Sequence, residues 1–161
     1  MDDGEKTAME AMRVRGLDMP LGSGDRRRWQ DRFNAMPAMK FSGAVVDLDD
    51  PRLIRVILPK IETYHEGGLG GSAVNGAVIC GMFDCALGVA GAQQFPGEST
   101  GTVELSIKMM RPARTAPLVF YAIATKRTLA ICFAESKLFS GNRLCAHCTG
   151  MVAVAKKEQS G

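Results

Sequence analysis

The sequence has 161 residues, the length of one domain with or without a short tail. Apolar residues make up 46% of the chain and charged residues 23%, which argues against a disordered, collagen-like or coiled-coil protein. The formal net charge is only +3, and this argues against a nucleic-acid partner, because phosphate-binding proteins concentrate more positive charge.

Two stretches of the sequence bear on where the protein works. Residues 1–16 are charged and lack the hydrophobic core of a signal peptide. The longest apolar run, residues 73–92, contains Asn75 and Asp84, and an ionised carboxylate at the centre of a bilayer is costly. We therefore expect a buried helix here, no membrane span and a cytoplasmic location. The five cysteines, without an export signal, favour reduced thiols over a disulfide framework.

Residues 1–38 are expected to form an N-terminal arm and a short helix. Residues 1–24 mix small, charged, glycine and proline residues, a pattern typical of a weakly ordered segment. A helix is predicted over residues 25–36, with Asp25 as its N-cap and Pro37 after its end. The apolar face of this helix comprises Trp29, Phe33 and Met36.

Residues 39–156 are expected to form the main domain, followed by a polar tail at 157–161. After a glycine-rich loop, residues 75–92 predict one long helix that is apolar on most sides. The predicted strands cover residues 39–46, 53–58, 101–110, 117–128, 130–140 and 143–155, with Gly141-Asn142 as a hairpin turn. Because such a helix must be enclosed, we predict an α+β fold in which an antiparallel sheet of about five or six strands wraps it.

One acidic residue stands on the predicted central helix. Steps of three and four residues place Ala77, Gly81, Asp84, Gly88 and Gly91 on one stripe, so every neighbour of the carboxylate there is small. In one interpretation the stripe admits another helix, and Asp84 is a structural residue satisfied by a buried hydrogen bond. In the other, Gly81 and Gly88 leave room for a substrate, and Asp84 acts as a general base or nucleophile.

The start of this helix supplies a second candidate group. Asn75 is a favoured N-cap residue, and Gly76 then occupies the first helical position. The N–H groups of a first turn lack intrahelical acceptors, and the helix dipole adds partial positive charge there. The Gly76 N–H is therefore suited to polarise a carbonyl oxygen, as in an oxyanion hole. The alternative is that Asn75 simply caps the helix and Gly76 relieves crowding.

The order and spacing of these residues resemble the hotdog-fold acyl-CoA thioesterases of the phenylacetyl-CoA thioesterase (PaaI-like) group. Asp84 follows Asn75 by nine residues, Thr102 follows Asp84 by eighteen, and GTVELSIKMMRPA at 101–113 is similar to a block of that group. The similarity covers about residues 40–155. It implies a hotdog fold, a homodimer or homotetramer, and hydrolysis of an acyl-CoA thioester, with coenzyme A present only as part of the substrate.

The resemblance also implies roles for single residues. By position, Asp84 matches the catalytic carboxylate, Gly76 the backbone donor to the thioester carbonyl, and Thr102 the hydroxyl that orients the water or the carboxylate. In such dimers the carboxylate and the backbone donor belong to opposite subunits. The group usually has a histidine where this chain has Asn75. We hypothesise that His65 and Asn75 have exchanged places, which would bring His65 near the thioester; the alternative is a loop histidine hydrogen-bonded locally.

Other signals are weaker. Cys145-Ala-His-Cys148 is not expected to bind a metal, because structural zinc needs about four ligands and no second CxxC motif is present. The coenzyme A phosphates need basic residues near the groove mouth, for which Arg111, Arg114, Lys126 and Arg127 are candidates. Two other functions stay open: an acyl-CoA-binding hotdog module without catalysis, and a hydratase or dehydratase acting on enoyl thioesters.

Overall fold

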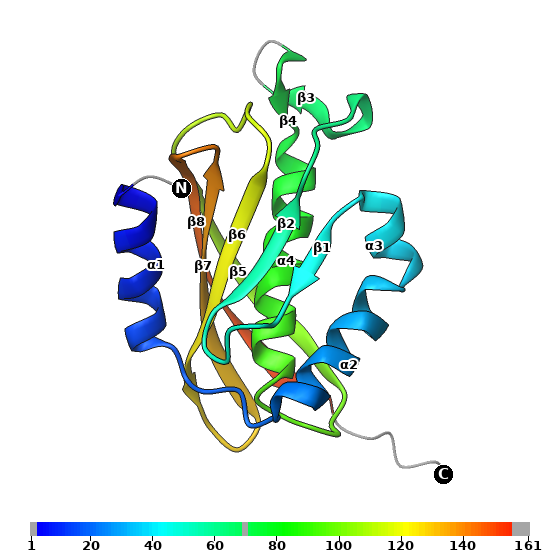
Figure 1. Ribbon diagram of the computed structural model, residues 1–161, viewed down its shortest axis with the longest axis vertical. Helices are drawn as coiled ribbons and strands as arrows, with labels where there is room; N and C mark the ends of the chain where they lie inside the picture. Colours follow the sequence, from blue (N-terminus) through cyan, green and yellow to red (C-terminus); the bar gives the residue numbers. More distant parts are fainter. Residues whose placement is uncertain (1–2, 69–70, 156–161) are drawn as a thin grey trace.

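The computed structural model describes residues 3–68 and 71–155, and within these ranges a six-stranded antiparallel sheet curves around the long helix α4, Gly76–Ala92 (Figure 1). The strand order is β1-β2-β6-β7-β8-β5, so β5 lies at one edge. The strands are β1 Val45–Asp47, β2 Ile54–Leu58, β5 Thr100–Met109, β6 Leu118–Arg127, β7 Ile131–Ser140 and β8 Arg143–Val154. The predicted α+β architecture, with an antiparallel sheet around one central helix, is confirmed.

Helix α4 begins where the sequence predicts it, because its first turn is capped by a side chain. The Asn75 Oδ1 accepts a hydrogen bond of 2.8 Å from the Ala77 N–H, as an N-cap residue does. One side of α4 is buried against the sheet, and its Phe83 ring meets Phe120 of β6 edge-on with centroids 5.0 Å apart. At Gly91 the helix comes so close to β8 that an added Cβ would stand 2.3 Å from the Val152 Cβ.

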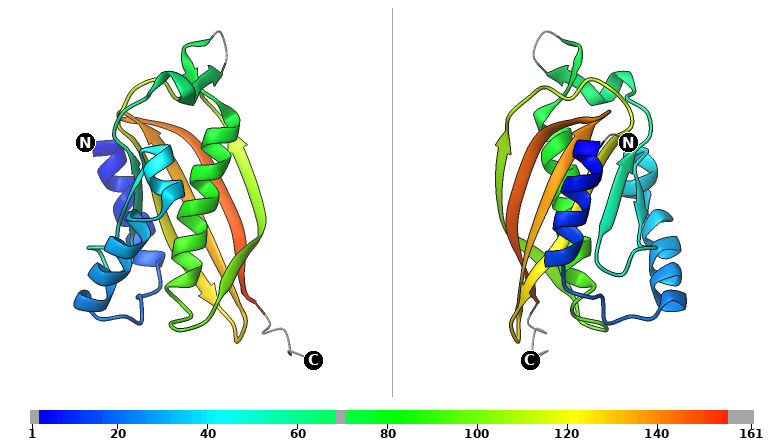
Figure 2. Two further views of the ribbon diagram at one scale, coloured as in Figure 1. Left: turned by 90° about the vertical axis from the view of Figure 1, so that its right-hand side faces the viewer. Right: turned by 60° about the vertical axis from the view of Figure 1, so that its left-hand side comes forward.

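The N-terminal segment is more ordered than predicted. Residues 1–24 were expected to be a weakly ordered arm, but α1, Asp3–Arg15, packs on the face of the sheet opposite α4 (Figure 2). Met12 is fully buried in a cluster with Tyr121, Ile123 and Phe139. Docking on the sheet stabilises this helix, and contacts between segments so far apart in the chain cannot be read from a local sequence pattern.

Two other N-terminal predictions need correction. Helix α2 spans Ser23–Asn34 with Gly22 as its N-cap, so Asp25 lies in the first turn and is not the cap. The strand predicted over residues 39–46 is wrong, because α3 occupies Pro37–Ser42 and only β1 follows it. Pro37 stands at the start of α3, where a fixed φ and a missing N–H are tolerated, and Gly43 ends it at φ +69°. The expected boundary at residues 38 and 39 therefore falls inside α3.

The glycine-rich loop before α4 contains regular structure. A 3₁₀ turn at Thr63–His65 leads into a small hairpin of β3, Glu66–Gly68, and β4, Ala73–Val74. The four strands after α4 agree with prediction within one or two residues at each end. Gly141, at φ +58°, makes the predicted tight turn between β7 and β8.

Candidate active site

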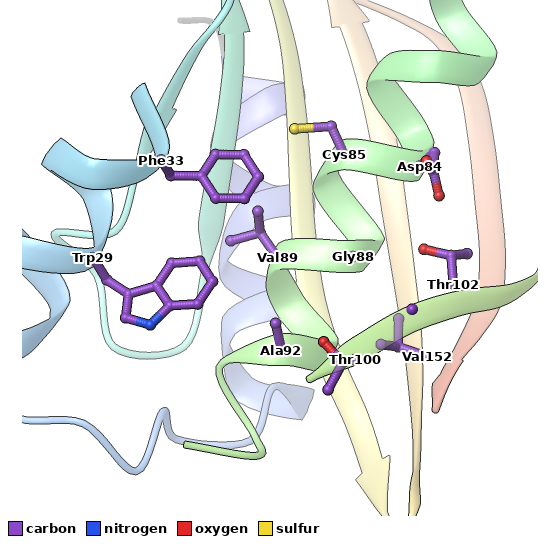
Figure 3. Close-up of a pocket in the computed structure, with 11 residues that line it drawn as sticks. Trp29, Phe33, Asp84, Cys85, Gly88, Val89, Ala92, Thr100, Thr102 and Val152 are labelled. Atoms are coloured by element: carbon purple, nitrogen blue, oxygen red, sulfur yellow. The ribbon is translucent and has the colours of Figure 1, made fainter. Parts of the chain in front are cut away.

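Asp84 stands on the exposed side of α4, and its carboxylate lies on the same side as the Thr102 hydroxyl of β5 (Figure 3). A Cβ added at Gly88 would come within 3.4 Å of the Thr102 Oγ1, so this hydroxyl sits directly over a glycine. Asp84 has no hydrogen-bond or ion-pair partner within residues 3–68 and 71–155. A free, accessible carboxylate favours the functional interpretation of Asp84 over that of a satisfied structural residue.

Asp84 and Thr102 line a cavity of about 380 Å³, and Gly88 of α4 lies between them in its lining. Its opposite wall is apolar and comes from α2, where the Trp29 and Phe33 rings are stacked with centroids 5.8 Å apart and point toward Val89 (Figure 3). The floor between the two walls is formed by the small or apolar side of α4. The cavity therefore has a polar side, with a carboxylate and a hydroxyl group, opposite an apolar side, as a site for an amphipathic ligand requires.

The pKa values of two nearby cysteine thiols reflect the low polarity of this region. Burial, with a smaller contribution from the Asp84 charge, raises the pKa of the Cys85 thiol to about 12. The Cys85 Sγ lies 3.8 Å from the Met39 sulfur. Burial, together with the charge of Asp84 and the Cys80 thiol, likewise raises the pKa of Cys148 to about 11. These thiols are therefore neutral near pH 7, so they are poor nucleophiles.

Gly76 lines a different cavity. This space of about 220 Å³ is bounded by Gly76, Ile79, Met109 and Arg111, among others, with the Met109 methyl 3.6 Å from where a Gly76 Cβ would stand. As the first residue of α4, Gly76 has an N–H without an intrahelical acceptor. Arg111 lines the same cavity and donates a hydrogen bond of 3.0 Å to the Leu144 carbonyl.

The structure does not bring Gly76 and Asp84 together within one chain. The two residues are eight positions apart on α4, which is about 12 Å along the helix axis at 1.5 Å per residue. Each opens into its own cavity. Within one chain, the two groups therefore do not face a common reacting atom.

His65 is buried at 3% exposure and engaged on both sides of its ring. Its Nδ1 accepts from the Glu62 N–H at 3.0 Å, so the Nε2 carries the proton and donates to the Ser42 carbonyl at 2.9 Å. Its own carbonyl accepts from the Asn75 N–H at 2.7 Å, which ties the loop to the start of α4. This geometry favours the local structural role that the sequence left open beside the catalytic one.

The remaining predicted groups are placed as follows. Gly81 is exposed, with no atom within 4 Å of an added Cβ among the described residues. Gly88 lines the same cavity as Asp84. Trp29 and Phe33 were predicted only as part of the apolar face of a helix. Their place in the cavity wall depends on the packing of α2 beside β1, where α2 faces α4.

The described parts of the chain hold no cluster of three or more His, Cys, Asp or Glu side chains arranged to bind a metal. Over the same residues, no helix has both the length and the apolar character needed to cross a bilayer.

No protein-family model and no curated protein sequence matches the chain. Solved structures do resemble it. A thioesterase from Haemophilus influenzae aligns with a TM-score of 0.74 at 13% identity, over 89% of this chain and 98% of its own. A thioesterase family protein from Silicibacter pomeroyi aligns with a TM-score of 0.71 at 20% identity, over 84% of this chain and 100% of its own.

The PaaI protein from the phenylacetic acid degradation operon of E. coli gives a TM-score of 0.70 at 12% identity, over 84% of this chain and 97% of its own. At these identities the comparison bears on architecture. The chain shares with these proteins the long helix packed against an antiparallel sheet, and the expected hotdog fold is confirmed. The protein therefore has the hotdog fold, in the form found in thioesterase-family proteins.

Proposed function

We propose that this protein is an acyl-CoA thioesterase, which hydrolyses the thioester to a free acid and coenzyme A. The observation that carries the proposal is the free Asp84 carboxylate beside the Thr102 hydroxyl, at the mouth of a cavity with an apolar opposite wall. Thioester hydrolysis needs a group that activates water or attacks the carbonyl, a role that a carboxylate can fill, and the acyl group needs an apolar space. The fold shared with thioesterase-family proteins supports the same reaction class.

In this proposal Asp84 is the nucleophile or the general base, and Thr102 orients the water or the carboxylate. Both roles require the carboxylate to be ionised and reachable, which fits its exposed position on α4. No cofactor takes part, and coenzyme A enters only as part of the substrate. All five cysteines lie within the described ranges and are free thiols, which suits a reducing cytoplasm.

The proposed working unit is a homodimer, alone or within a homotetramer. Strand β5 lies at the edge of the sheet, with ten residues whose outward backbone groups are free to pair with another strand. Val103 and Met109 on this strand are apolar side chains that are 62% and 50% exposed. A second copy paired along β5 would cover them.

Such a dimer would also complete the site. It would allow Gly76 of the partner subunit to approach the thioester held at Asp84, with its N–H and the helix dipole polarising the carbonyl. Asn75 would hold that helix start in place through its cap, and Arg111 would stand near enough to Gly76 to bind a coenzyme A phosphate.

The test is a hydrolysis assay with short, medium, long and aromatic acyl-CoA substrates. Loss of thioester absorbance should be followed, because a thiol dye would also react with the protein's cysteines. Asp84→Asn keeps the shape of the side chain and should lower kcat by about 10²–10⁴-fold, the usual contribution of a general base. The control is Asp31→Asn, which neutralises an exposed carboxylate on α2 and should keep the wild-type rate. Equal rates for the two variants would refute the assignment of Asp84.

A second candidate is an acyl-CoA-binding module that does not cleave its ligand. It is favoured by Asn75, whose side-chain oxygen already accepts a hydrogen bond in the cap of α4. Asn75 also lacks the positive charge of a protonated histidine. Binding of acyl-CoA without release of thiol from any substrate would support this candidate. Formation of a 3-hydroxyacyl product from an enoyl thioester would point instead to a hydratase.

A further inference from the structure

A larger cavity continues from the Asp84 site. It measures about 620 Å³ and lies between α2, the end of α4 and the connection to β5. Four residues line both spaces, namely Trp29, Phe33, Ala92 and Thr100. These shared residues place the two cavities next to each other, and we call their common boundary, at the aromatic rings and the last turn of α4, the waist.

The lining of this second cavity includes both apolar and charged residues. Leu21, Met36 and Phe95 contribute apolar surface, whereas Arg32 and Glu98 contribute charges. From Asp84 to Ala92 the path follows α4 for eight residues, which is about 12 Å. A ligand that starts at the carboxylate and fills both spaces must therefore be long, and it must be flexible enough to pass the waist.

We propose that the two cavities form one binding path for an extended, flexible acyl chain, and that Trp29 and Phe33 determine its length preference. This inference rests on the proposed function, since it places the acyl carbonyl at Asp84. Each space alone lies within the range of about 300–1,000 Å³ that is usual for small-ligand sites. A short acyl group would leave the larger one to water, while a chain of about eight or more carbons would bury methylenes against both rings.

The ring pair is suited to this role by its position and its support. Trp29 and Phe33 are four residues apart on α2, so their side chains lie on one face and stack. Both are half-buried and pack against the central core. The wall is therefore held in place before a ligand arrives, and a flat aromatic surface accepts methylene groups without demanding hydrogen bonds.

Trp29 is the only tryptophan in the sequence, so its fluorescence reports directly on this path. The Asp84→Asn variant should be titrated with decanoyl-CoA and, separately, with acetyl-CoA. Decanoyl-CoA should shift or quench the emission of Trp29 in a saturable way, and acetyl-CoA should leave the emission unchanged. The same response to both ligands, or no response to decanoyl-CoA, would overturn the proposal.

A chain-length series tests the same path by turnover. For the wild type, kcat/KM should rise by about fourfold per methylene from butyryl-CoA to decanoyl-CoA, the factor expected for burying one methylene. Ala92→Leu narrows the waist, so kcat/KM should stop rising at a shorter acyl chain. Trp29→Ala removes part of the aromatic wall, so kcat/KM should depend less on chain length. The control is Arg28→Ala, whose side chain pairs with Asp25 on α2 and lines neither cavity.

The outcomes of these experiments distinguish the extended binding path from the proposed thioesterase function. Hydrolysis with a flat chain-length profile in the wild type would refute the extended path and leave the thioesterase proposal intact. No hydrolysis of any substrate would refute the thioesterase proposal, and the fluorescence titration would then decide whether the path binds an acyl chain. The melting temperature of each variant should be measured, so that a loss of fold is not mistaken for a loss of specificity.

Discussion

Replacement of Gly91 by alanine is the sharpest test of how closely α4 packs on the sheet. The added Cβ would stand 2.3 Å from the Val152 Cβ and 2.6 Å from one of its methyl groups. The Val152 Cβ cannot rotate away, so α4 or β8 must move, and overpacking of this kind costs about 1–3 kcal/mol. Alanine in place of glycine gains about 1 kcal/mol in a helix interior. For a contact this short we expect the upper value of the overpacking cost, from which the gain in helix propensity is subtracted. The free energy of unfolding should therefore fall by about 2 kcal/mol, and Tm by roughly 4–8 °C.

The matched control is Gly81→Ala on the same helix, where an added Cβ meets nothing within 4 Å among the described residues. This variant should gain the helix-propensity term alone and melt higher by about 2–4 °C. Both should be compared with the wild type by circular dichroism at one protein concentration. Adding Val152→Gly should recover part of the Gly91→Ala loss in a double-mutant cycle. A Gly91→Ala protein as stable as the wild type would refute the close packing of α4 on β8.

Three further predictions concern stability and charge. Met12→Ala should lower the free energy of unfolding, measured in urea, by about 2–5 kcal/mol, because the side chain is fully buried. The control Met36→Ala, at a side chain that is 46% exposed, should leave it nearly unchanged. Equal losses in the two variants would show that α1 does not dock on the sheet. His65→Ala should lower stability by about 1–3 kcal/mol through two lost hydrogen bonds, and a fall in kcat without a fall in Tm would instead assign a catalytic role. The pKa of Cys85 lies at about 12 against an ordinary value of 9.0, so the unfolded chain releases this proton at a lower pH than the folded chain. Stability should therefore fall as the pH rises from 9 to 12. Cys85→Ser should make that fall shallower, and an unchanged slope would contradict the buried neutral thiol.

The sequence predicted the central helix and the last four strands well because their signals are local. Asn75 is a cap that needs only its own turn, and some strand ends are marked by proline or glycine, such as Pro117 before β6 and Gly141 after β7. The prediction was wrong over residues 39–44, where the apolar pattern fitted a strand but Pro37 started a helix, and only residues 45 and 46 of the predicted strand lie in β1. Helix α1 was missed for a different reason, since its order depends on contacts with Tyr121 and Phe139, more than a hundred residues away.

The candidate site was predictable in part. The stripe of small residues correctly placed Asp84 over Gly88, because helical spacing alone decides which side chains share a face. The stacked Trp29 and Phe33 wall was not predicted, since it requires α2 to face α4 across the cavity from fifty positions away in the chain. The hydrogen bonds of His65 were likewise invisible, because one of its partners, Ser42, lies in a different element.

Strand β6 is covered on both faces, and this has a consequence for dynamics. Its residues alternate between the core under α4, with Phe120 and Ala122, and the cluster under α1, with Tyr121 and Ile123. The strand is also paired along both edges, with β2 and β7. Its amide protons can therefore reach solvent only when neighbouring elements separate, and we expect them to exchange with deuterium last, at the rate of global unfolding. Amides on β5, at the open edge, should exchange early in a monomer.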